Sequence, residues 1–198
     1  MTQLPEPALS RQDIRKMIRQ RRRELTVQQQ IDFAEQAAGR MMAYPPVLMA
    51  RTVALFLSFD GELNTQPLIN QLWHAGKRVY LPVLHPFSPG NLLFLHYHPQ
   101  SELVVNRLKI QEPRLDVRDV LPLNSLDVLI APLVAFDEQG QRLGMGGGFY
   151  DRTLQNWQQY GISPVGYAHD CQRVEKLPVE KWDIPLPAVV TPSKIWRW

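Results

Sequence analysis

The sequence predicts an α/β protein with three layers, α/β/α, in which helices cover both faces of a mostly parallel sheet. Short apolar runs rich in β-branched residues alternate with helical patterns, which is the order of βαβ units. The first two such runs, residues 51–58 and 78–83, are separated by a helical stretch that Gly76 ends. A helical segment over residues 10–43 precedes them, and we expect it to be an N-terminal arm of a single domain spanning residues 1–198.

The composition indicates a globular protein that needs no disulfides. Of the 198 residues, 44% are hydrophobic and 21% are charged. The single cysteine, Cys171, has no internal partner, so a reducing cytosol is the expected compartment. No apolar run approaches the roughly 20 residues of a membrane span, and residues 1–10 lack the basic-then-apolar order of a secretion signal. We expect a cytoplasmic protein that contacts no membrane.

The N-terminal segment contains two helix-start patterns. Ser10 with Asp13, and Thr26 with Gln29, have the residue types and the three-residue spacing of N-caps with a polar partner. The proline pair at residues 45–46 ends the second helix.

The first of these helices is strongly basic. Between Arg11 and Arg23 lie seven basic residues and one acid, so this segment must face anions or water. A solvated helix face, a nucleic acid and a small phosphate-bearing ligand all fit such a run. No aromatic residue interleaves it to stack bases, so we do not expect nucleic acid as the partner.

The remaining elements follow from apolar periodicity and from glycine and proline positions. Residues 51–58 read as a strand buried on both faces, residues 85–120 as an irregular, loop-rich insertion, and Pro132 as the end of a long strand or a bulge in it. The other expected elements are helices at 65–75 and 150–160 and strands at 78–83, 92–97, 125–136, 165–168 and 188–191.

Residues 142–151, RLGMGGGFYD, carry the strongest functional pattern. Glycine loses the most backbone entropy on folding, so a glycine cluster indicates positive φ angles or a backbone that approaches a ligand closely. Successive amide N–H groups before a helix bind anions, and Arg142 adds a full charge. A tight turn without a ligand is the alternative. The pattern is neither a Walker loop nor a dinucleotide fingerprint, so it predicts a phosphate site without a kinase or dehydrogenase assignment.

Two carboxylates suit a metal at that phosphate site. Asp151 begins the helix after the glycines, and Asp183 precedes the last expected strand. Mg²⁺ prefers one or two carboxylates together with waters and phosphate oxygens. Taken singly, Asp151 also suits a helix start and Asp183 a turn.

Four patches together resemble one family over almost the whole chain, in matching order and spacing. The sequence is similar to the 5-formyltetrahydrofolate cyclo-ligases, also called 5,10-methenyltetrahydrofolate synthetases, at Arg11-x-x-x-Arg15, Leu57 to Thr65, Arg142-Leu143-Gly144-x-Gly146-Gly147-Gly148-x-Tyr150-Asp151, and Trp182-Asp183 followed by Val189-Val190-Thr191-Pro192. The resemblance implies ATP- and Mg²⁺-dependent closure of 5-formyltetrahydrofolate to 5,10-methenyltetrahydrofolate through an N5-iminophosphate. It also implies a fold of the kind seen in sugar-phosphate isomerases and CoA transferases (NagB/RpiA/CoA-transferase-like).

The resemblance assigns roles to residues that match the family motifs. Arg15, Arg142 and Tyr150 would be catalytic, and Asp151 and Asp183 would hold Mg²⁺. The folate would contact Leu57, Glu62, Met145, Gly146, Gly147, Gly148 and Phe149. ATP would contact Arg11, Gln12, Asp13, Ile14, Arg15, Arg142, Leu143, Gly144, Met145, Gly146, Gly147, Gly148, Phe149 and Tyr150.

Three residues depart from the family pattern. Family members often have a basic or aromatic residue at position 145, tyrosine at 149 and lysine at 11, where this chain has Met145, Phe149 and Arg11. Phe149 keeps the ring but lacks the hydroxyl, and Arg11 keeps the charge with a different donor geometry. Two further residues are ambiguous on local grounds: without the resemblance, Glu62 reads as a solvated loop acid and Leu57 as a core strand residue.

Two other functions compete with the ligase. An isomerase or acyl-CoA transferase needs a general base or a nucleophilic glutamate in an apolar pocket, and no residue is patterned for it. A non-catalytic module that binds folate or RNA has no need of the Asp151–Asp183 pair. We expect a monomer whose basic run, residues 19–23, attracts the polyglutamate tail of a polyglutamylated substrate.

Overall fold

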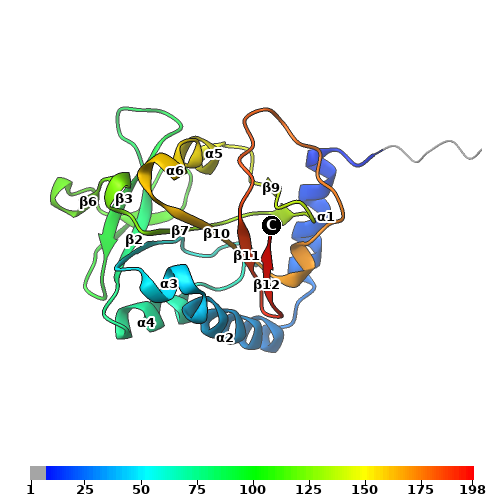
Figure 1. The fold of residues 1–198 in the computed structure, drawn as a ribbon, viewed down its shortest axis with the longest axis horizontal. Helices are drawn as coiled ribbons and strands as arrows, with labels where there is room; N and C mark the ends of the chain where they lie inside the picture. The colour runs from blue at the N-terminus through cyan, green and yellow to red at the C-terminus, as the bar shows by residue number, and fades with distance from the viewer. Residues whose placement is uncertain (1–7) are drawn as a thin grey trace, which may run out of the picture.

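The protein is described by a computed structural model of residues 8–198, built around an eight-stranded sheet (Figure 1). Residues 1–7, part of the segment inspected for a secretion signal, lie outside the described residues. The strands of this sheet are β1 (Thr52–Ala54), β2 (Arg78–Leu84), β3 (Leu92–Tyr97), β6 (Val120–Leu121), β7 (Val128–Ala131), β10 (Ser163–Tyr167), β11 (Ala188–Val190) and β12 (Ile195–Arg197).

The sheet is mixed, in the order β12-β11-β10-β7-β1-β2-β3-β6. The five strands from β11 to β2 are parallel to one another, whereas β12 and β3 run antiparallel to the neighbours they join. Because β1 has β2 on one side and β7 on the other, the strand order reverses at β1. Open α/β sheets bind ligands at the carboxyl ends of strands at such a point.

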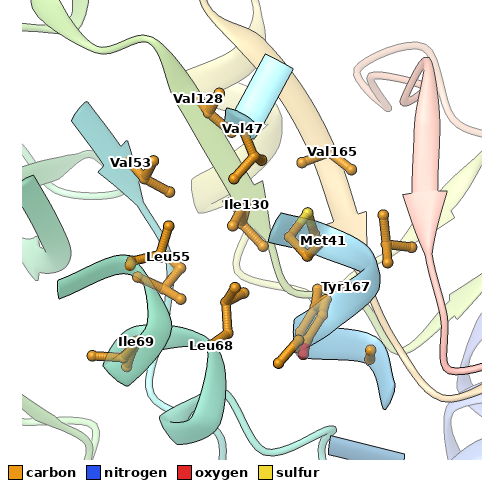
Figure 2. Packing of buried hydrophobic residues seen from close by; sticks show 14 of the residues in the cluster. Met41, Val47, Val53, Leu55, Leu68, Ile69, Val128, Ile130, Val165 and Tyr167 are labelled. Atoms are coloured by element: carbon orange, nitrogen blue, oxygen red, sulfur yellow. The ribbon is translucent and has the colours of Figure 1, made fainter. Parts of the chain in front are cut away.

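Helices pack on both faces of the sheet (Figure 1). Within residues 8–198 the α-helices are α1 (Arg11–Arg23), α2 (Val27–Ala43), α3 (Pro45–Met49), α4 (Gln66–His74), α5 (Phe149–Leu154) and α6 (Trp157–Tyr160). Side chains from β1, β7 and β10 point toward Met41 of α2, Val47 of α3 and Leu68 of α4 in one core (Figure 2). Leu154 and Trp157 pack against the opposite face. The α/β prediction is confirmed, while the likeness to isomerase and transferase folds stays a prediction.

Both predicted helix starts are confirmed. Ser10 and Asp13 form a reciprocal capping box at α1, and Thr26 and Gln29 form one at α2. The predicted arm divides into two parts, because α2 covers the sheet and its alanines 37 and 38 are fully buried. Close approach of a helix to a sheet needs small side chains, which these alanines provide.

Three predicted elements are shorter than expected, and one of them is the strand predicted at residues 125–136, which in the main sheet is only β7, Val128–Ala131. Regular pairing in β1 ends at Ala54, although the N–H of Leu55 still donates to the carbonyl of Tyr80 at 3.0 Å. The chain then leaves the sheet toward a turn at Asp60 and Gly61, which both have positive φ. The helix predicted at residues 150–160 is two short helices, because Asn156 leaves the helical conformation with φ −123°.

The basic run of α1 is only partly exposed to solvent. Arg22 is 1% exposed, and the apolar face of α1 contacts a two-stranded hairpin, β8 (Ala135–Phe136) and β9 (Arg142–Leu143). Ile14, Ile18 and Leu143 form the small core between them. The helix therefore supports the hairpin that leads into the glycine loop.

The insertion at residues 85–120 contains more structure than predicted. A second hairpin pairs β4 (Leu103–Val105) with β5 (Gln111–Pro113), and Lys109 at its turn has φ +60°. The carboxylate of Glu112 accepts from the N–H of Leu84 at 3.1 Å and from the amide of Asn106 at 2.9 Å. These bonds fix the hairpin against the end of β2.

Candidate active site

A large cavity, of about 850 Å³, opens at the carboxyl ends of β1, β2 and β7. Residues that follow β1 and β7, and residues in the last part of β2, line it, so it lies where the sheet order reverses. Its walls combine apolar side chains with arginines and carboxylates, a composition typical of a small-molecule site. The glycine loop, the start of α1 and the segment after β1 meet there, with the lining residues Arg11, Arg15, Leu57, Glu62, Arg142, Gly144, Met145, Gly146, Gly147, Gly148, Phe149, Tyr150 and Asp151 among them.

The glycine loop has the backbone that its composition predicted. Gly146 and Gly148 have φ +108° and +68°, a region that L side chains rarely adopt. The N–H groups of residues 145–148 donate to no protein acceptor among residues 8–198. Exposed, successive N–H groups of this kind form a cradle for an anion. The helix behind them, α5, is only six residues long, so the free amides rather than a long helix dipole provide most of the attraction.

Two arginines hold this loop in place. The Nε of Arg15 donates to the carbonyl of Gly144 at 2.9 Å. Arg152 donates to the carbonyls of Gly147 and Gly90, and its guanidinium lies 5.7 Å from the ring centroid of Phe149. Both arginines therefore occupy loop carbonyls, which leaves the loop N–H groups directed elsewhere.

Two ion pairs hold the predicted metal ligands, of which Asp151 lines the cavity and Asp183 is buried beside it and does not line it. Arg142 donates to Oδ1 of Asp151 at 2.6 Å, and Arg11 donates to both oxygens of Asp183 at 2.5 and 3.2 Å. Despite burial, hydrogen bonds from Arg11 and from the Glu180 N–H lower the pKa of Asp183. The two ion pairs also interact with each other: the charge of Asp151 raises the pKa of Arg11, and the charge of Arg142 lowers the pKa of Asp183. Among residues 8–198, no three histidine, cysteine or acidic side chains gather as a metal cage.

Glu62 occupies a different environment, on the loop that follows β1. Its Oε2 accepts from the N–H of Phe59 at 3.1 Å, and Leu57 and Phe56 lie on the same wall. Burial raises the pKa of Glu62 to about 7, against the opposing effects of the Phe59 N–H and the charge of Arg22. Glu62 is half-buried and lines the cavity, so its carboxylate is partly shielded from solvent.

Tyr150 stands between the two environments. Burial and the nearby Glu62 raise the pKa of its phenol, and the charge of Arg142 opposes them. The hydroxyl is therefore neutral at any physiological pH and serves as a hydrogen-bond donor or acceptor. Its ring also packs on the core beneath α5.

Four residues predicted to contact ATP have side chains outside the cavity lining. Ile14 and Leu143 are buried in the small core between α1 and its supporting hairpin. Asp13 completes the helix cap with Ser10, and Gln12 accepts a 3.4 Å hydrogen bond from Arg15. Any contact of Ile14 or Leu143 with a nucleotide therefore has to come from the backbone.

The β4–β5 hairpin forms a wall of the cavity that the sequence did not predict. Leu108, Lys109 and Glu112 line it, as does Trp182, which is 63% exposed. An isolated lysine and leucine in an irregular region carry no pattern that would mark them.

The family model of the 5-formyltetrahydrofolate cyclo-ligases matches residues 8–192. The chain belongs to the 5-formyltetrahydrofolate cyclo-ligase family. It is 82% identical to the 5-formyltetrahydrofolate cyclo-ligase of Escherichia coli (strain K12), over 92% of this chain and 100% of that relative. The enzyme of the same name from Haemophilus influenzae is 53% identical, over 89% of this chain and 94% of the relative.

A solved cyclo-ligase-family structure has the same fold. The NMR structure of Aquifex aeolicus 5,10-methenyltetrahydrofolate synthetase superimposes with a TM-score of 0.80 and 28% identity, covering 94% of this chain and 92% of that one. The protein is therefore an enzyme, a cyclo-ligase, and the isomerase, transferase and binding-module hypotheses are excluded as its main function. None of the helices within residues 8–198 is both long and apolar enough to cross a membrane.

Proposed function

We propose that this cyclo-ligase uses ATP and Mg²⁺ to convert 5-formyltetrahydrofolate into 5,10-methenyltetrahydrofolate, with release of ADP and phosphate. The observation that carries the proposal is the composition of one cavity: a free-amide glycine loop with arginines at one end, and a half-buried carboxylate among apolar residues at the other. The free N–H groups and arginines suit a triphosphate, and the carboxylate among apolar residues suits a pterin ring, from whose N–H groups it can accept hydrogen bonds. A cavity of about 850 Å³ is large enough for parts of both.

The reaction needs both ligands side by side. A formamide oxygen is a poor leaving group, so the formyl oxygen first attacks the γ-phosphorus of ATP and ADP departs. The resulting N5-iminophosphate has an activated carbon, which the N10 nitrogen attacks to close the ring. The carbon–oxygen bond then breaks and inorganic phosphate leaves. Phosphoryl transfer of this kind depends mainly on positioning and on charge stabilisation.

The arginines and the loop would provide that stabilisation. Arg15 and Arg142 line the cavity beside the free N–H groups of residues 145–148, and we assign them to the phosphates together with the neutral hydroxyl of Tyr150. Arg11 would exchange its carboxylate partner for a phosphate oxygen, because both are anionic acceptors of bidentate hydrogen bonds. Gln12, Asp13, Ile14 and Leu143 would contribute through backbone or helix-start contacts.

Asp151 and Asp183 would hold Mg²⁺. Oδ1 of Asp151 already accepts from Arg142 and from the N–H of Ile184, whereas Oδ2 has no hydrogen-bond partner within residues 8–198. Two carboxylates completed by waters and phosphate oxygens suit magnesium. The ion would neutralise charge on the transferring phosphoryl group.

The folate would lie on the opposite wall. Leu57 and Met145 to Phe149 offer apolar and backbone contacts, and ionised Glu62 would accept hydrogen bonds from the pterin. The absence of a hydroxyl on Phe149 costs the site one polar group and leaves the stacking surface. We further propose that the enzyme is a cytoplasmic monomer and that it accepts polyglutamylated folate.

A direct assay tests the proposal. The protein is incubated with 5-formyltetrahydrofolate, Mg²⁺ and ATP, and the methenyl chromophore is followed in the near ultraviolet, with phosphate release measured in parallel. We expect equal amounts of methenyl product and phosphate, and loss of both signals in EDTA. Ring closure in the absence of any nucleotide would exclude the ATP-dependent mechanism, and no chromophore with any nucleotide would exclude the reaction.

A further inference from the structure

Helix α1 reaches both ends of the cavity. Its first turns carry Arg11 and Arg15 at the glycine loop, and its last turns lie against the turn that precedes Glu62. There Asp60 accepts from Arg19 at 2.8 Å and from Arg23 at 3.0 Å, and lies 3.5 Å from Arg22.

Asp60 has an unusual backbone for this role. Its φ is +51°, in the left-handed region that non-glycine residues rarely adopt, and Gly61 follows with φ +74°. Such a conformation costs energy and persists only where the surrounding structure fixes it. Three guanidinium groups on one carboxylate supply that constraint, and they tie the loop carrying Glu62 to α1.

Arg22 differs from the other two arginines because it is buried. Its side chain is 1% exposed, compared with 39% for Arg19 and 58% for Arg23. Its Nε and Nη1 have no hydrogen-bond partner among residues 8–198. Burying a guanidinium with free N–H groups costs free energy. One ion pair with Asp60 does not offset this cost, which indicates that Arg22 has a further role.

The loop beneath Glu62 lies directly on Arg22. A Cβ placed on Gly61 would be 3.4 Å from the Cβ of Arg22. The charged or titratable groups facing Arg22 and Glu62 are Asp60 from the loop, Arg19 from α1, Tyr150 from α5, and His169 and Cys171 from the segment after β10. His169 is neutral there, because burial lowers its pKa to about 4, and burial raises the pKa of the Cys171 thiol. Arg22 is therefore the buried positive charge behind Glu62.

We infer that Arg22 is a positioning residue for folate binding, which holds the Glu62 loop against α1 and places a buried positive charge behind it. The inference rests on the proposed role of Glu62. Asp60 and Gly61 shape the turn, and Arg22 fills the space behind it. The charge of Arg22 lowers the pKa of Glu62, which opposes the effect of burial. Arg22 itself does not line the cavity.

The experiment compares two substitutions at Arg22. Arg22→Gln keeps polar atoms and removes the charge, whereas Arg22→Lys keeps the charge, since two carboxylates adjoin it. The acidic limb, which is the fall of kcat/KM for folate at low pH, reports the pKa of a group that must be ionised in the free enzyme. Here that group is Glu62. We expect Arg22→Gln to move this limb upward by about one pH unit, which lowers kcat/KM about tenfold at pH values below the limb. The KM for ATP should stay within about twofold, and Arg22→Lys should keep the wild-type limb.

Controls separate a local electrostatic role from general damage. Arg23→Gln removes an exposed arginine from the same Asp60 carboxylate and should leave the limb in place. Asp60→Asn removes a negative charge that raises the pKa of Glu62, so the limb should move downward. This variant decides the question if Arg22→Gln does not fold. An unmoved limb in Arg22→Gln, or a limb that fails to move downward in Asp60→Asn, would overturn the inference.

Glu62→Gln distinguishes this inference from the proposal beneath it. If Glu62→Gln keeps a normal KM for folate and a normal acidic limb, the proposed role of Glu62 fails. If Glu62→Gln loses the limb and raises the KM for folate while Arg22→Gln does neither, the role of Arg22 alone fails.

Discussion

The two ends of the cavity are built in opposite ways. At the glycine-loop end, main-chain N–H groups are free, Met145 is 50% exposed, and the charged side chains form ion pairs with one another. At the Glu62 end, the carboxylate is half-buried, Arg22 is 1% exposed, and a strained turn is fixed by three arginines. The glycine-loop end therefore has N–H groups, unpaired within residues 8–198, that are available to a ligand, whereas the side chains at the Glu62 end are already fixed by protein contacts.

This difference indicates how each end binds. Under the proposed function, an ion pair such as Arg11–Asp183 would have to open before a phosphate or a metal enters, so nucleotide binding at the loop end would exchange existing partners. The Glu62 end has little to rearrange, which lowers the cost of ordering a ligand there. We expect substitutions at the loop end to affect catalysis strongly and those at the Glu62 end to affect folate binding and stability.

The largest expected effect is that of Asp151→Asn. The amide still accepts from Arg142 and from the Ile184 N–H, so the fold should be retained, but the charge that would hold Mg²⁺ is lost. Turnover should fall about a hundredfold or more, measured by methenyl formation, with folding checked by circular dichroism. Asp116→Asn, at an exposed acid paired with Arg118, is the control and should be silent. Full turnover in Asp151→Asn would remove this residue from the metal site.

A smaller effect is expected from Gly148→Ala. Gly148 has φ +68°, and a Cβ there would lie 3.0 Å from Arg152. Gly76→Ala is the matched control, because Gly76 has φ +73° and no atom within 4 Å of the added Cβ. Both should lose about 1 kcal/mol of unfolding free energy from backbone strain. Only Gly148→Ala should raise the KM for ATP, and equal kinetic effects in both variants would show that the loop acts through stability alone.

The smallest effect concerns stability and pH at the Glu62 end. The pKa of Glu62 rises from 4.5 to about 7 on folding, so the folded state favours the protonated carboxyl. Its stabilising contribution is therefore complete below the unfolded pKa and is lost as pH rises through about 7. Relative to Glu62→Gln, the wild-type protein should lose melting temperature between about pH 5 and pH 8. A difference that does not vary with pH would mean that Glu62 is solvated in the folded protein.

Local patterns in the sequence predicted what local physics determines. Ser10 and Asp13 have the spacing of a capping box before an apolar helical pattern, and they form that cap. Pro132 ends β7, because a proline has no N–H for the sheet. The glycine loop was predictable in conformation because Gly146 and Gly148 occupy a region closed to most residues. The break at Asn156 was missed because apolar periodicity continues across it.

Features that depend on distant partners were not predictable. Arg22 sits in a run of exposed arginines, and only the folded loop at Asp60 buries it. The ion pair of Arg11 with Asp183 joins residues 172 positions apart, and no spacing rule links them. Lys109 reaches the cavity only because Glu112 fastens its hairpin to β2.

The same Arg11–Asp183 pair has a consequence for synthesis on the ribosome. The helix carrying Arg11 is made first, whereas its carboxylate partner, and the Glu180 N–H that orients that partner, emerge only when the chain is nearly complete. Until then the nascent chain has a cationic helix with no acidic counterpart from this segment at the cavity. A newly made chain therefore completes this ion pair only near the end of synthesis, and a chain truncated shortly before residue 183 would keep the glycine loop and Arg11 without that carboxylate.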